Sequence, residues 1–305
     1  MTNYHTPVML QECLDGLHIN PSGIYIDVTF GAGGHSIPIL NRLDANGHLY
    51  SFDKDEDVRR NLVDAANFTF IHADFRYIYR FLRYYNISNV DGILADLGVS
   101  SFQLDSSGRG FGFVSGGELN MRMNKGASAT AANILNTYTE IDLVKMFSEY
   151  GEVRNSKTLA RRIAARRKAQ KFSTIQDFLE SISDLVLGQR SRYLAQVFQA
   201  LRIEVNQEMD ALQILLETSL DCLKPGGRLV VMSYHSLEDR IVKRFMKSGN
   251  VKGEIERDDY GRSNVPFKLV NKKVIVAGDA ELELNPRARS AKLRIAEKLD
   301  IDVKS

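Results

Sequence analysis

The sequence predicts an α/β fold in which a mostly parallel sheet, covered by helices on both faces, is interrupted by a small helical insert. Strand-like runs alternate with helical segments at both ends of the chain, which is the pattern of strand–helix–strand units. The gap between the fourth and fifth strand-like runs is much longer than the 10 to 15 or so residues of a crossover helix. With 305 residues, 44% of them hydrophobic, the chain can bury a core for both parts.

The predicted strands are runs rich in β-branched and aromatic residues, each bounded by glycine, asparagine or aspartate. The last two runs lie close together in sequence and predict an antiparallel hairpin at the end of the chain. The runs comprise residues 23–30, 47–55, 68–75, 91–100, 226–235, 271–278 and 291–298.

The insert is predicted over residues 104–215, which leaves residues 1–103 and 216–305 as a discontinuous sheet domain. It begins with a segment rich in glycine and serine and then becomes helical.

Two pairs of residues in the insert have the spacing of an N-terminal capping box. These pairs, Thr139 with Asp142 and Ser173 with Gln176, each precede an amphipathic helical segment. Two further helical segments, 192–205 and 206–223, lead back to the sheet.

Composition excludes several classes of protein. The net charge is only +2, so a nucleic-acid partner has to be argued from local clusters of charge. Cys13 and Cys222 have no partner at metal-ligand spacing, so we expect neither a zinc site nor a disulfide framework. No run approaches the roughly 20 apolar residues of a membrane span, and we expect a cytoplasmic protein without a membrane partner.

A glycine-rich turn follows the first predicted strand. Gly31, Gly33 and Gly34 precede His35 and Ser36, so the third glycine of the G-x-G-x-x-G dinucleotide motif is replaced by Ser36. S-adenosylmethionine (SAM) has no pyrophosphate and requires only a bend that its methionyl and ribose parts can approach. The spacing therefore favours SAM over a dinucleotide.

Polar and aromatic residues follow the next three strands. Asp53 comes 20 residues after Gly33, the spacing at which an acid reaches ribose hydroxyls in such folds. Phe75 follows the third strand and could stack on adenine, although a core position is an equal alternative. Asp96 ends an otherwise apolar strand. A buried carboxylate needs hydrogen-bonding or charged partners, so an acid at this position favours a functional role.

The chain resembles the RsmH (MraW) family of bacterial 16S ribosomal RNA cytosine-N4 methyltransferases. The resemblance extends over nearly the whole chain and rests on several long motifs in the same order. These motifs are "HTPVMLQE" (5–12), "DVTFGAGGHS" (27–36), "ADLGVSSFQLD" (95–105), "RGFGF" (109–113), "LNMRM" (119–123), "FQALRIEVN" (198–206), "KPGGRLVVMSYHSLEDRIVK" (224–243) and "NPRARSAKLR" (285–294).

The resemblance implies a Rossmann-like sheet of the class I SAM-dependent methyltransferases and a set of SAM-binding residues. His35 and Gln103 enter this set through the resemblance alone. One departure concerns Phe102, at a position where the family commonly has proline. The implied SAM-binding residues are Gly33, Gly34, His35, Asp53, Phe75, Asp96 and Gln103.

The implied reaction is methylation of N4 of a cytosine in the decoding region, at the P site, of 16S ribosomal RNA. The lone pair on N4 is conjugated into the ring, so acceptors must hold its N–H groups and position the nitrogen. Asp96 is one candidate for this role, and Tyr234 and His235 after the fifth strand are rivals. Methyl transfer from a sulfonium needs no metal, and none is predicted.

A basic segment in the insert indicates contact with RNA phosphates. Between Glu152 and Lys171 it contains eight cations and no further acid, and a basic segment near residues 287–294 adds to it. A solvated helix face is the plain alternative. The predicted RNA-binding residues are Arg161, Arg162, Arg166 and Arg167.

The expected partner is therefore 16S ribosomal RNA within the small ribosomal subunit. Two other functions are compatible with these residues: an amino-methyltransferase acting on DNA or a small molecule, and a non-catalytic ribosome-assembly factor that uses the fold to bind RNA. The sequence leaves open the oligomeric state, with a homodimer as one option, the proton acceptor, and the choice between free RNA and assembled subunit.

Overall fold

A computed structural model describes residues 7–113, 117–255, 257, 261, 263 and 265–300 of the chain. It divides into two compact units, which we call the sheet unit (residues 1–98 and 210–305) and the helical unit (residues 99–209).

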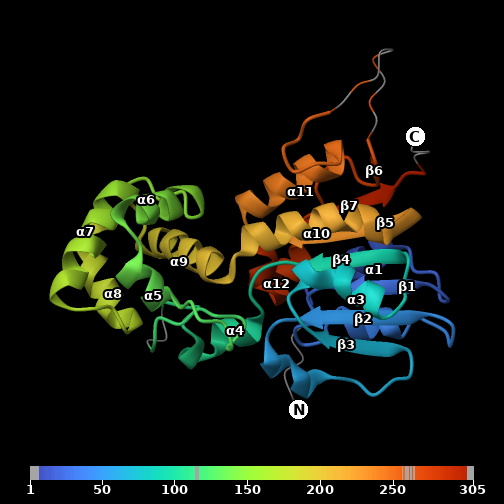
Figure 1. Cartoon of the computed structure of the whole chain (residues 1–305), viewed down its shortest axis with the longest axis horizontal. Helices are drawn as coiled ribbons and strands as arrows, with labels where there is room; N and C mark the ends of the chain where they lie inside the picture. Colours follow the sequence, from blue (N-terminus) through green and yellow to red (C-terminus); the bar gives the residue numbers. More distant parts are fainter. Residues whose placement is uncertain are drawn as a thin grey trace. The chain divides into compact units, whose positions relative to one another are not determined.

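The sheet unit contains a seven-stranded sheet in the order β3-β2-β1-β4-β5-β7-β6 (Figure 1). Strands β1 to β5 are parallel, and β7 is antiparallel to both β5 and β6, which confirms the predicted mostly parallel sheet. The strands are β1 (Ile24–Asp27), β2 (His48–Asp53), β3 (Phe68–His72), β4 (Val90–Asp96), β5 (Leu223–Ser233), β6 (Phe267–Leu269) and β7 (Lys292–Lys298).

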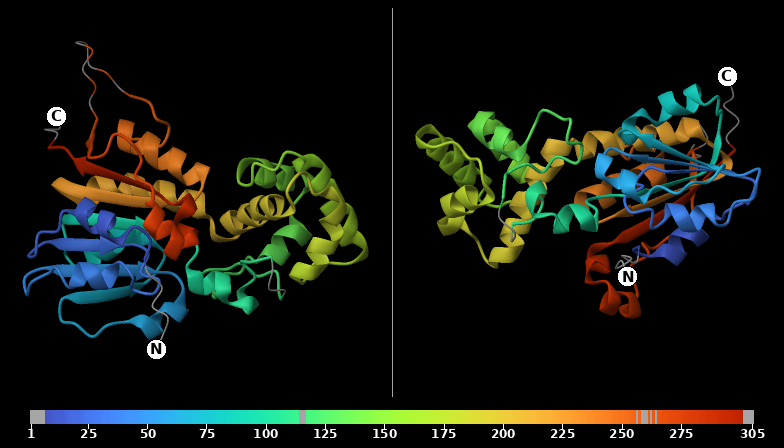
Figure 2. Two further views of the ribbon diagram at one scale, coloured as in Figure 1. Left: turned by 180° about the vertical axis from the view of Figure 1, so that it is seen from behind. Right: turned by 90° about the horizontal axis from the view of Figure 1, so that it is seen from below.

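Helices cover both faces of this sheet because its central strands are apolar on both sides. Ile26 and Ile93 belong to one core with α3, α10 and α11, while the alternate residues Tyr25 and Leu94 belong to a second core with α1 and α2 (Figure 2). The helices are α1 (Leu10–Leu17), α2 (Ser36–Leu40), α3 (Ile78–Tyr84), α10 (Glu208–Cys222), α11 (Ser236–Ser248) and α12 (Asp279–Leu284), with 3-10 turns η1 (Glu56–Asn61), η2 (Phe75–Tyr77) and η5 (Pro286–Ser290).

The terminal hairpin differs in part from the prediction. The antiparallel pairing is as predicted, since β6 pairs with β7 in this way. The position of the first strand differs: β6 precedes residues 271–278, and these residues contribute only an isolated bridge between Ile275 and Leu293. The reason is local: the side-chain oxygen of Asn271 accepts the Ile295 N–H at 2.9 Å, in the place of a strand carbonyl.

The helical unit packs around its own apolar core, which includes Phe147, Phe178 and Leu201. Its elements are α4 (Ser101–Asp105), η3 (Ser107–Arg109), α5 (Ala131–Thr137), α6 (Glu140–Glu149), α7 (Ser156–Ala169), α8 (Ile175–Ile182), η4 (Ser183–Leu185) and α9 (Arg190–Asn206).

One of the two predicted helix caps in this unit is displaced. Thr139 caps α6 and accepts the Asp142 N–H as predicted, but the box is half formed, since the Asp142 side chain accepts the Thr139 hydroxyl at 2.6 Å and not its N–H. The cap of α8 is Thr174 paired with Asp177, one residue after the predicted Ser173 and Gln176, because the short Asp177 carboxylate accepts the Thr174 N–H at 3.1 Å. In the described part of the chain, no helix is both long and apolar enough to cross a membrane.

Candidate active site

The carboxyl edge of the parallel sheet gathers three acids. Asp27, Asp53 and Asp96 are the last residues of β1, β2 and β4, and parallel strands end at a common edge where ligands bind in such folds. The loops after β3 and β5 bring Phe75 and Tyr234 to the same edge.

The glycine turn between β1 and α2 depends on its missing side chains. Gly31 and Gly33 have positive φ angles of 54° and 78°, a region that side chains disfavour. A Cβ atom on Gly33 would lie only 3.0 Å from Ile37 Cδ1, and one on Gly34 only 3.0 Å from Pro7 Cβ. The glycines therefore let the turn pack closely against α2 and Pro7, with Gly33 buried and Gly31 and Gly34 partly exposed.

A hydrogen-bond network below this turn includes residues that the sequence analysis did not single out. The Asp96 N–H donates to Thr29 Oγ1 at 2.7 Å, and this hydroxyl donates to Asp27 Oδ1 at 3.1 Å. The second oxygen of Asp27 accepts the Ser36 hydroxyl at 2.6 Å. Asp27 is fully buried, so its role is to join the ends of β1, β4 and α2. The signal was available, since Asp27 ends an apolar strand as Asp96 does.

Asp53 supports the turn and still faces the carboxyl edge. Its two oxygens accept the backbone N–H groups of Gly31 and Asp55, both at 2.8 Å. Burial raises its pKa to about 6 against the opposing effect of these two N–H groups. Each carboxylate oxygen has more than one acceptor site, so Asp53 can also accept hydroxyl groups from a ligand.

Asp96 is the centre of a second cluster. Tyr234 donates its hydroxyl to Asp96 Oδ1 at 2.8 Å, although the two residues are 138 positions apart. His35 Nδ1 lies 3.6 Å from Asp96 Oδ2. Burial raises the pKa of Asp96 to about 6, although His35 and the Tyr234 hydroxyl oppose this shift. About a quarter of the Asp96 side chain remains exposed, so a ligand can reach it.

The orientation of His35 determines where a proton can reside in this cluster. His35 Nε2 lies 3.0 Å from the Val8 carbonyl oxygen, which can only accept, so Nε2 carries hydrogen. In the neutral ring, Nδ1 is then a lone-pair acceptor facing the Asp96 carboxylate. The ring of His35 is thus held through Nε2 and presents Nδ1 to Asp96 Oδ2.

Tyr234 is held in its phenol form by this arrangement. Burial raises its pKa, and the nearby Asp96 charge and the hydrogen bond to it raise it further. Tyr234 is consequently a hydrogen-bond donor to Asp96, and a direct role for Tyr234 in orienting the target amine stays a prediction.

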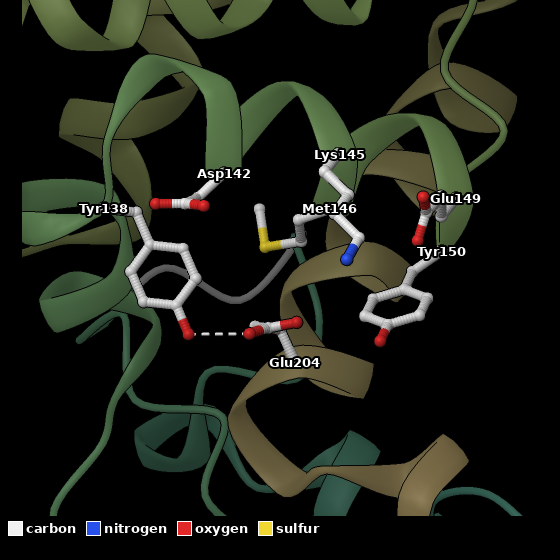
Figure 3. Close-up of a pocket in the computed structure, with 7 residues that line it drawn as sticks. All are labelled: Tyr138, Asp142, Lys145, Met146, Glu149, Tyr150 and Glu204. Atoms are coloured by element: carbon white, nitrogen blue, oxygen red, sulfur yellow. Dashed lines mark hydrogen bonds between the residues drawn. The ribbon is translucent and has the colours of Figure 1, made fainter.

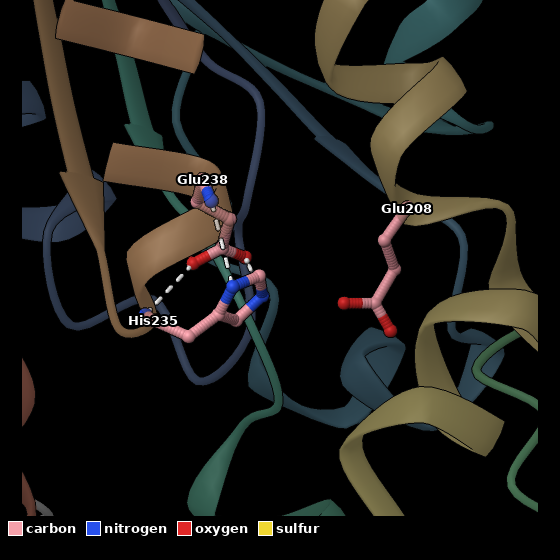
Figure 4. Close-up of side chains that lie close together, drawn as sticks. All are labelled: Glu208, His235 and Glu238. Atoms are coloured by element: carbon pink, nitrogen blue, oxygen red, sulfur yellow. Dashed lines mark hydrogen bonds and ion pairs between the residues drawn. The ribbon is translucent and has the colours of Figure 1, made fainter. Parts of the chain in front are cut away.

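His235, another predicted catalytic residue, is used as a helix cap (Figure 4). Its Nδ1 accepts the Glu238 N–H at 3.4 Å, and its Nε2 lies 3.2 Å from Glu238 Oε1. Glu238 in turn accepts the Tyr234 N–H at 2.9 Å. His235 thus helps to fix the turn that carries Tyr234, and a direct catalytic role for His235 remains a prediction.

Two further predicted cofactor residues lie in different units. Phe75 is partly buried and packs against the core beneath α3, next to Asp74, which accepts the Arg76 N–H at 3.0 Å. Gln103 belongs to the helical unit, where its side-chain oxygen accepts the Ser100 N–H at 3.1 Å. This capping box begins α4, so Phe102 is compatible with the start of the helix.

The four arginines predicted to bind RNA differ in their surroundings. Arg162 forms a bidentate ion pair with Asp184 at 2.7 and 2.8 Å, and Arg167 donates to the Leu135 carbonyl at 2.9 Å. Arg166 donates to the Gln170 side chain at 2.7 Å. Arg161 is 79% exposed and lies 3.9 Å from Glu140 Oε1, an exposed ion pair that contributes little, so it is the most open of the four to phosphate.

A hollow of about 290 Å³ on the helical unit lies between α6 and α9 (Figure 3). Tyr138 donates to Glu204 at 2.6 Å across it. Its lining contains more carboxylates than cations, so it is unsuited to phosphate. The lining residues are Tyr138, Asp142, Lys145, Met146, Glu149, Tyr150 and Glu204.

Comparison with known proteins assigns the chain to a family. A sequence model of the MraW methylase family matches residues 2–299. The chain belongs to the MraW methylase family.

Relatives agree with this assignment along the chain. Proteins named ribosomal RNA small subunit methyltransferase H from Phocaeicola vulgatus and Bacteroides thetaiotaomicron are each 57% identical over 296 residues, which cover 97% of this chain and 97% of each relative. The protein of that name from Flavobacterium johnsoniae is 52% identical over 297 residues, covering 97% of this chain and 98% of the relative.

As a member of the MraW methylase family, the chain has the Rossmann-like sheet of class I SAM-dependent methyltransferases, with an antiparallel β7 beside β5. The residues at its carboxyl edge fit SAM. Asp53 offers acceptors for ribose hydroxyls, the turn is partly exposed at Gly31 and Gly34, and Phe75 presents an aromatic ring beside the same edge.

Proposed function

We propose that this protein transfers a methyl group from SAM to N4 of a cytosine in the decoding region, at the P site, of 16S ribosomal RNA in the small ribosomal subunit. The observation that carries this proposal is the 57% identity, over 97% of both chains, to proteins named ribosomal RNA small subunit methyltransferase H. The proposed site of action is the cytoplasm.

At the proposed SAM site, Asp53 accepts the ribose hydroxyls while its N–H partners at Gly31 and Asp55 hold the carboxylate in place. The turn at Gly33, Gly34 and His35 approaches the methionyl part. Bound SAM supplies an electrophilic methyl group on a sulfonium sulfur. Phe75 covers the adenine.

Asp96 is the proposed acceptor for the target amine. Tyr234 fixes the orientation of its carboxylate through Oδ1, which leaves Oδ2 to accept an N–H of N4 and turn the nitrogen lone pair toward the methyl group. As the N–C bond forms, the sulfur–methyl bond would break with its electron pair left on sulfur, and the proton released from N4 would move to Asp96 Oδ2, beside His35 Nδ1. A pKa of about 6 suits a group that must be charged before the step and accept a proton during it.

The helical unit is the proposed RNA-recognition domain. Along α7, the exposed side chains of Lys157, Arg161 and Lys168 lie within about 40° of one another at 100° per residue. They form a row of cations that suits an RNA backbone, whereas Arg166 falls on the opposite side of α7, and Arg162 and Arg167 hold the unit together.

The deciding experiment measures incorporation of labelled methyl groups from SAM into purified small ribosomal subunits, free 16S ribosomal RNA and DNA. We expect label on N4 of one cytosine in subunits or RNA, and none in the Asp96→Asn variant. Label in DNA alone would indicate a different amino-methyltransferase, and RNA binding without label would indicate an assembly factor.

A further inference from the structure

The segment "FRYIYRFLRYYN", residues 75–86, places an unusual set of side chains on the surface of the sheet unit. Helix α3 buries Ile78 and Leu82 against the sheet. At 100° per residue, Arg80, Arg83 and Tyr84 fall on its opposite face, and Tyr79 lies on the flank between the two faces. We call these four residues, together with the preceding Tyr77, the tyrosine face.

The aromatic rings of this face are open to solvent. Tyr77, Tyr79 and Tyr84 are 41%, 49% and 76% exposed, whereas an aromatic ring that serves only the core is buried. No acid occurs between Asp74 and Asp91 in the sequence, so the positive charge of Arg80 and Arg83 is not neutralised within this segment.

Cation–π contacts keep the arginines and tyrosines together. The Arg80 guanidinium lies 5.2 Å from the Tyr77 ring centre, and the Arg83 guanidinium lies 6.0 Å from that of Tyr79. Both distances lie within or at the limit for such contacts. The side chains are therefore partly ordered before any partner arrives, which lowers the entropic cost of binding.

A row of aromatic rings supports the far end of the face. His48 and Tyr50, on β2, have ring centres 4.4 Å apart, Tyr50 lies 5.3 Å from Tyr85, and Tyr85 lies 5.1 Å from Tyr84. Because His48 and Tyr50 are anchored in the sheet, the exposed Tyr84 ring projects from a rigid base.

We propose that the tyrosine face binds single-stranded RNA, with its tyrosines stacking on unpaired bases and Arg80 and Arg83 contacting phosphates. The proposal rests on the proposed function and adds an RNA contact on the sheet unit, separate from the cations of α7. Exposed aromatic rings interleaved with arginines form the kind of surface that binds unpaired nucleotides without strong sequence preference.

Charge and size favour RNA as the occupant. A second copy of the chain joined symmetrically would bring Arg80 and Arg83 against themselves, which like-charge repulsion disfavours. From Tyr77 to Tyr84 the helical rise is about 10 Å, the length of about three stacked nucleotides at about 3.4 Å each.

The test measures binding of a fluorescein-labelled single-stranded 12-nucleotide RNA by fluorescence anisotropy at two salt concentrations. Tyr79→Ala and Tyr84→Ala should each weaken binding by about five-fold or more, since a stacked base contributes about 1 to 3 kcal/mol. Tyr79→Phe and Tyr84→Phe retain the ring and should bind as the unchanged protein does. The double variant Arg80→Gln with Arg83→Gln should reduce the slope of log K against log salt concentration by about 1.4. Each lost phosphate contact on single-stranded RNA accounts for about 0.7 of this slope.

The unchanged protein offers a direct second readout because it contains 12 tyrosines and no tryptophan. Stacked bases should quench its tyrosine fluorescence, and the Tyr84→Ala variant should lose part of that quenching. Lys243→Gln, an exposed cation on α11, is the matched control and should change neither signal.

Methylation of small subunits separates this proposal from the proposed function. We expect the alanine variants to raise KM for subunits while kcat and SAM affinity stay unchanged. The proposal for the tyrosine face would be overturned if the alanine variants bound RNA with unchanged affinity, or if the unchanged protein did not bind the RNA. Either result would count whether or not subunits are methylated. Loss of affinity for intact subunits but not for free RNA would assign the face to a ribosomal protein instead and equally overturn the proposal.

Discussion

Replacing Asp96 by asparagine should make the protein more stable at neutral pH while removing its activity. The structure accommodates the amide: asparagine Oδ1 can accept the Tyr234 hydroxyl, and its NH₂ group can donate to His35 Nδ1, which is the acceptor when Nε2 donates to Val8. The substitution therefore removes a buried negative charge without leaving a partner unsatisfied.

The magnitude follows from the pKa of Asp96, which is raised from 3.8 to about 6 in the folded protein. A shift of about two units corresponds to about 3 kcal/mol of folding free energy. Because a quarter of the side chain is exposed, solvent reduces this value, and we expect about 1 to 2 kcal/mol.

The sign sets the pH dependence. The raised pKa means that the folded state holds the proton more tightly than the unfolded state, so the unchanged protein loses this stability as the pH rises from about 4 to about 6. The advantage of Asp96→Asn should appear over the same interval, be constant above pH 7 and vanish near pH 4.

Thermal unfolding of both proteins at pH 4.5 and 7.5, without ligand, is the assay, with an expected gain of a few degrees at pH 7.5 and about a third of that gain at pH 4.5. Single-turnover methyl transfer should fall at least about 100-fold, as for loss of a general base, together with SAM affinity. A melting temperature below that of the unchanged protein at pH 7.5 would refute the burial argument, and full activity would refute the assignment of Asp96 as acceptor.

Three further predictions concern the site and the helical unit. Asp53→Ala should weaken SAM binding about ten-fold or more, because ribose hydroxyls lose their acceptor; unchanged affinity by calorimetry would exclude this role. Arg161→Gln should weaken RNA binding and lower its salt dependence, with no change in melting temperature. Arg162→Gln should lower the melting temperature, because it breaks the ion pair with Asp184. If Arg161→Gln and the unchanged protein show equal salt slopes, α7 does not contact RNA and is only a solvated helix face. His235→Asn can still cap α11 and should retain the methyl-transfer rate under single-turnover conditions. A large loss of this rate, with SAM and RNA affinity unchanged, would indicate that His235 is a catalytic group.

Local patterns in the sequence were enough to predict the parallel strands and the carboxylates at their ends. Alternating strand and helix segments allow few topologies, and parallel strands place their carboxyl ends at one edge. Asp53 and Asp96 could therefore be assigned to that edge before any coordinates. The cap at Thr139 was predictable for the same reason, since a capping box involves residues only three positions apart.

Only the tertiary structure decided which side chains meet. Tyr234 reaches Asp96 across 138 positions of sequence, and the Val8 carbonyl orients His35 across 27; no local periodicity encodes such contacts. His235 resembled a base in sequence because its neighbours are hydroxyl residues, but the start of α11 uses its ring as a cap. The tyrosine face emerged for the same reason: the sequence shows aromatic residues at helical spacing, and only the packing of Ile78 and Leu82 on the sheet determines that Tyr79 and Tyr84 face water.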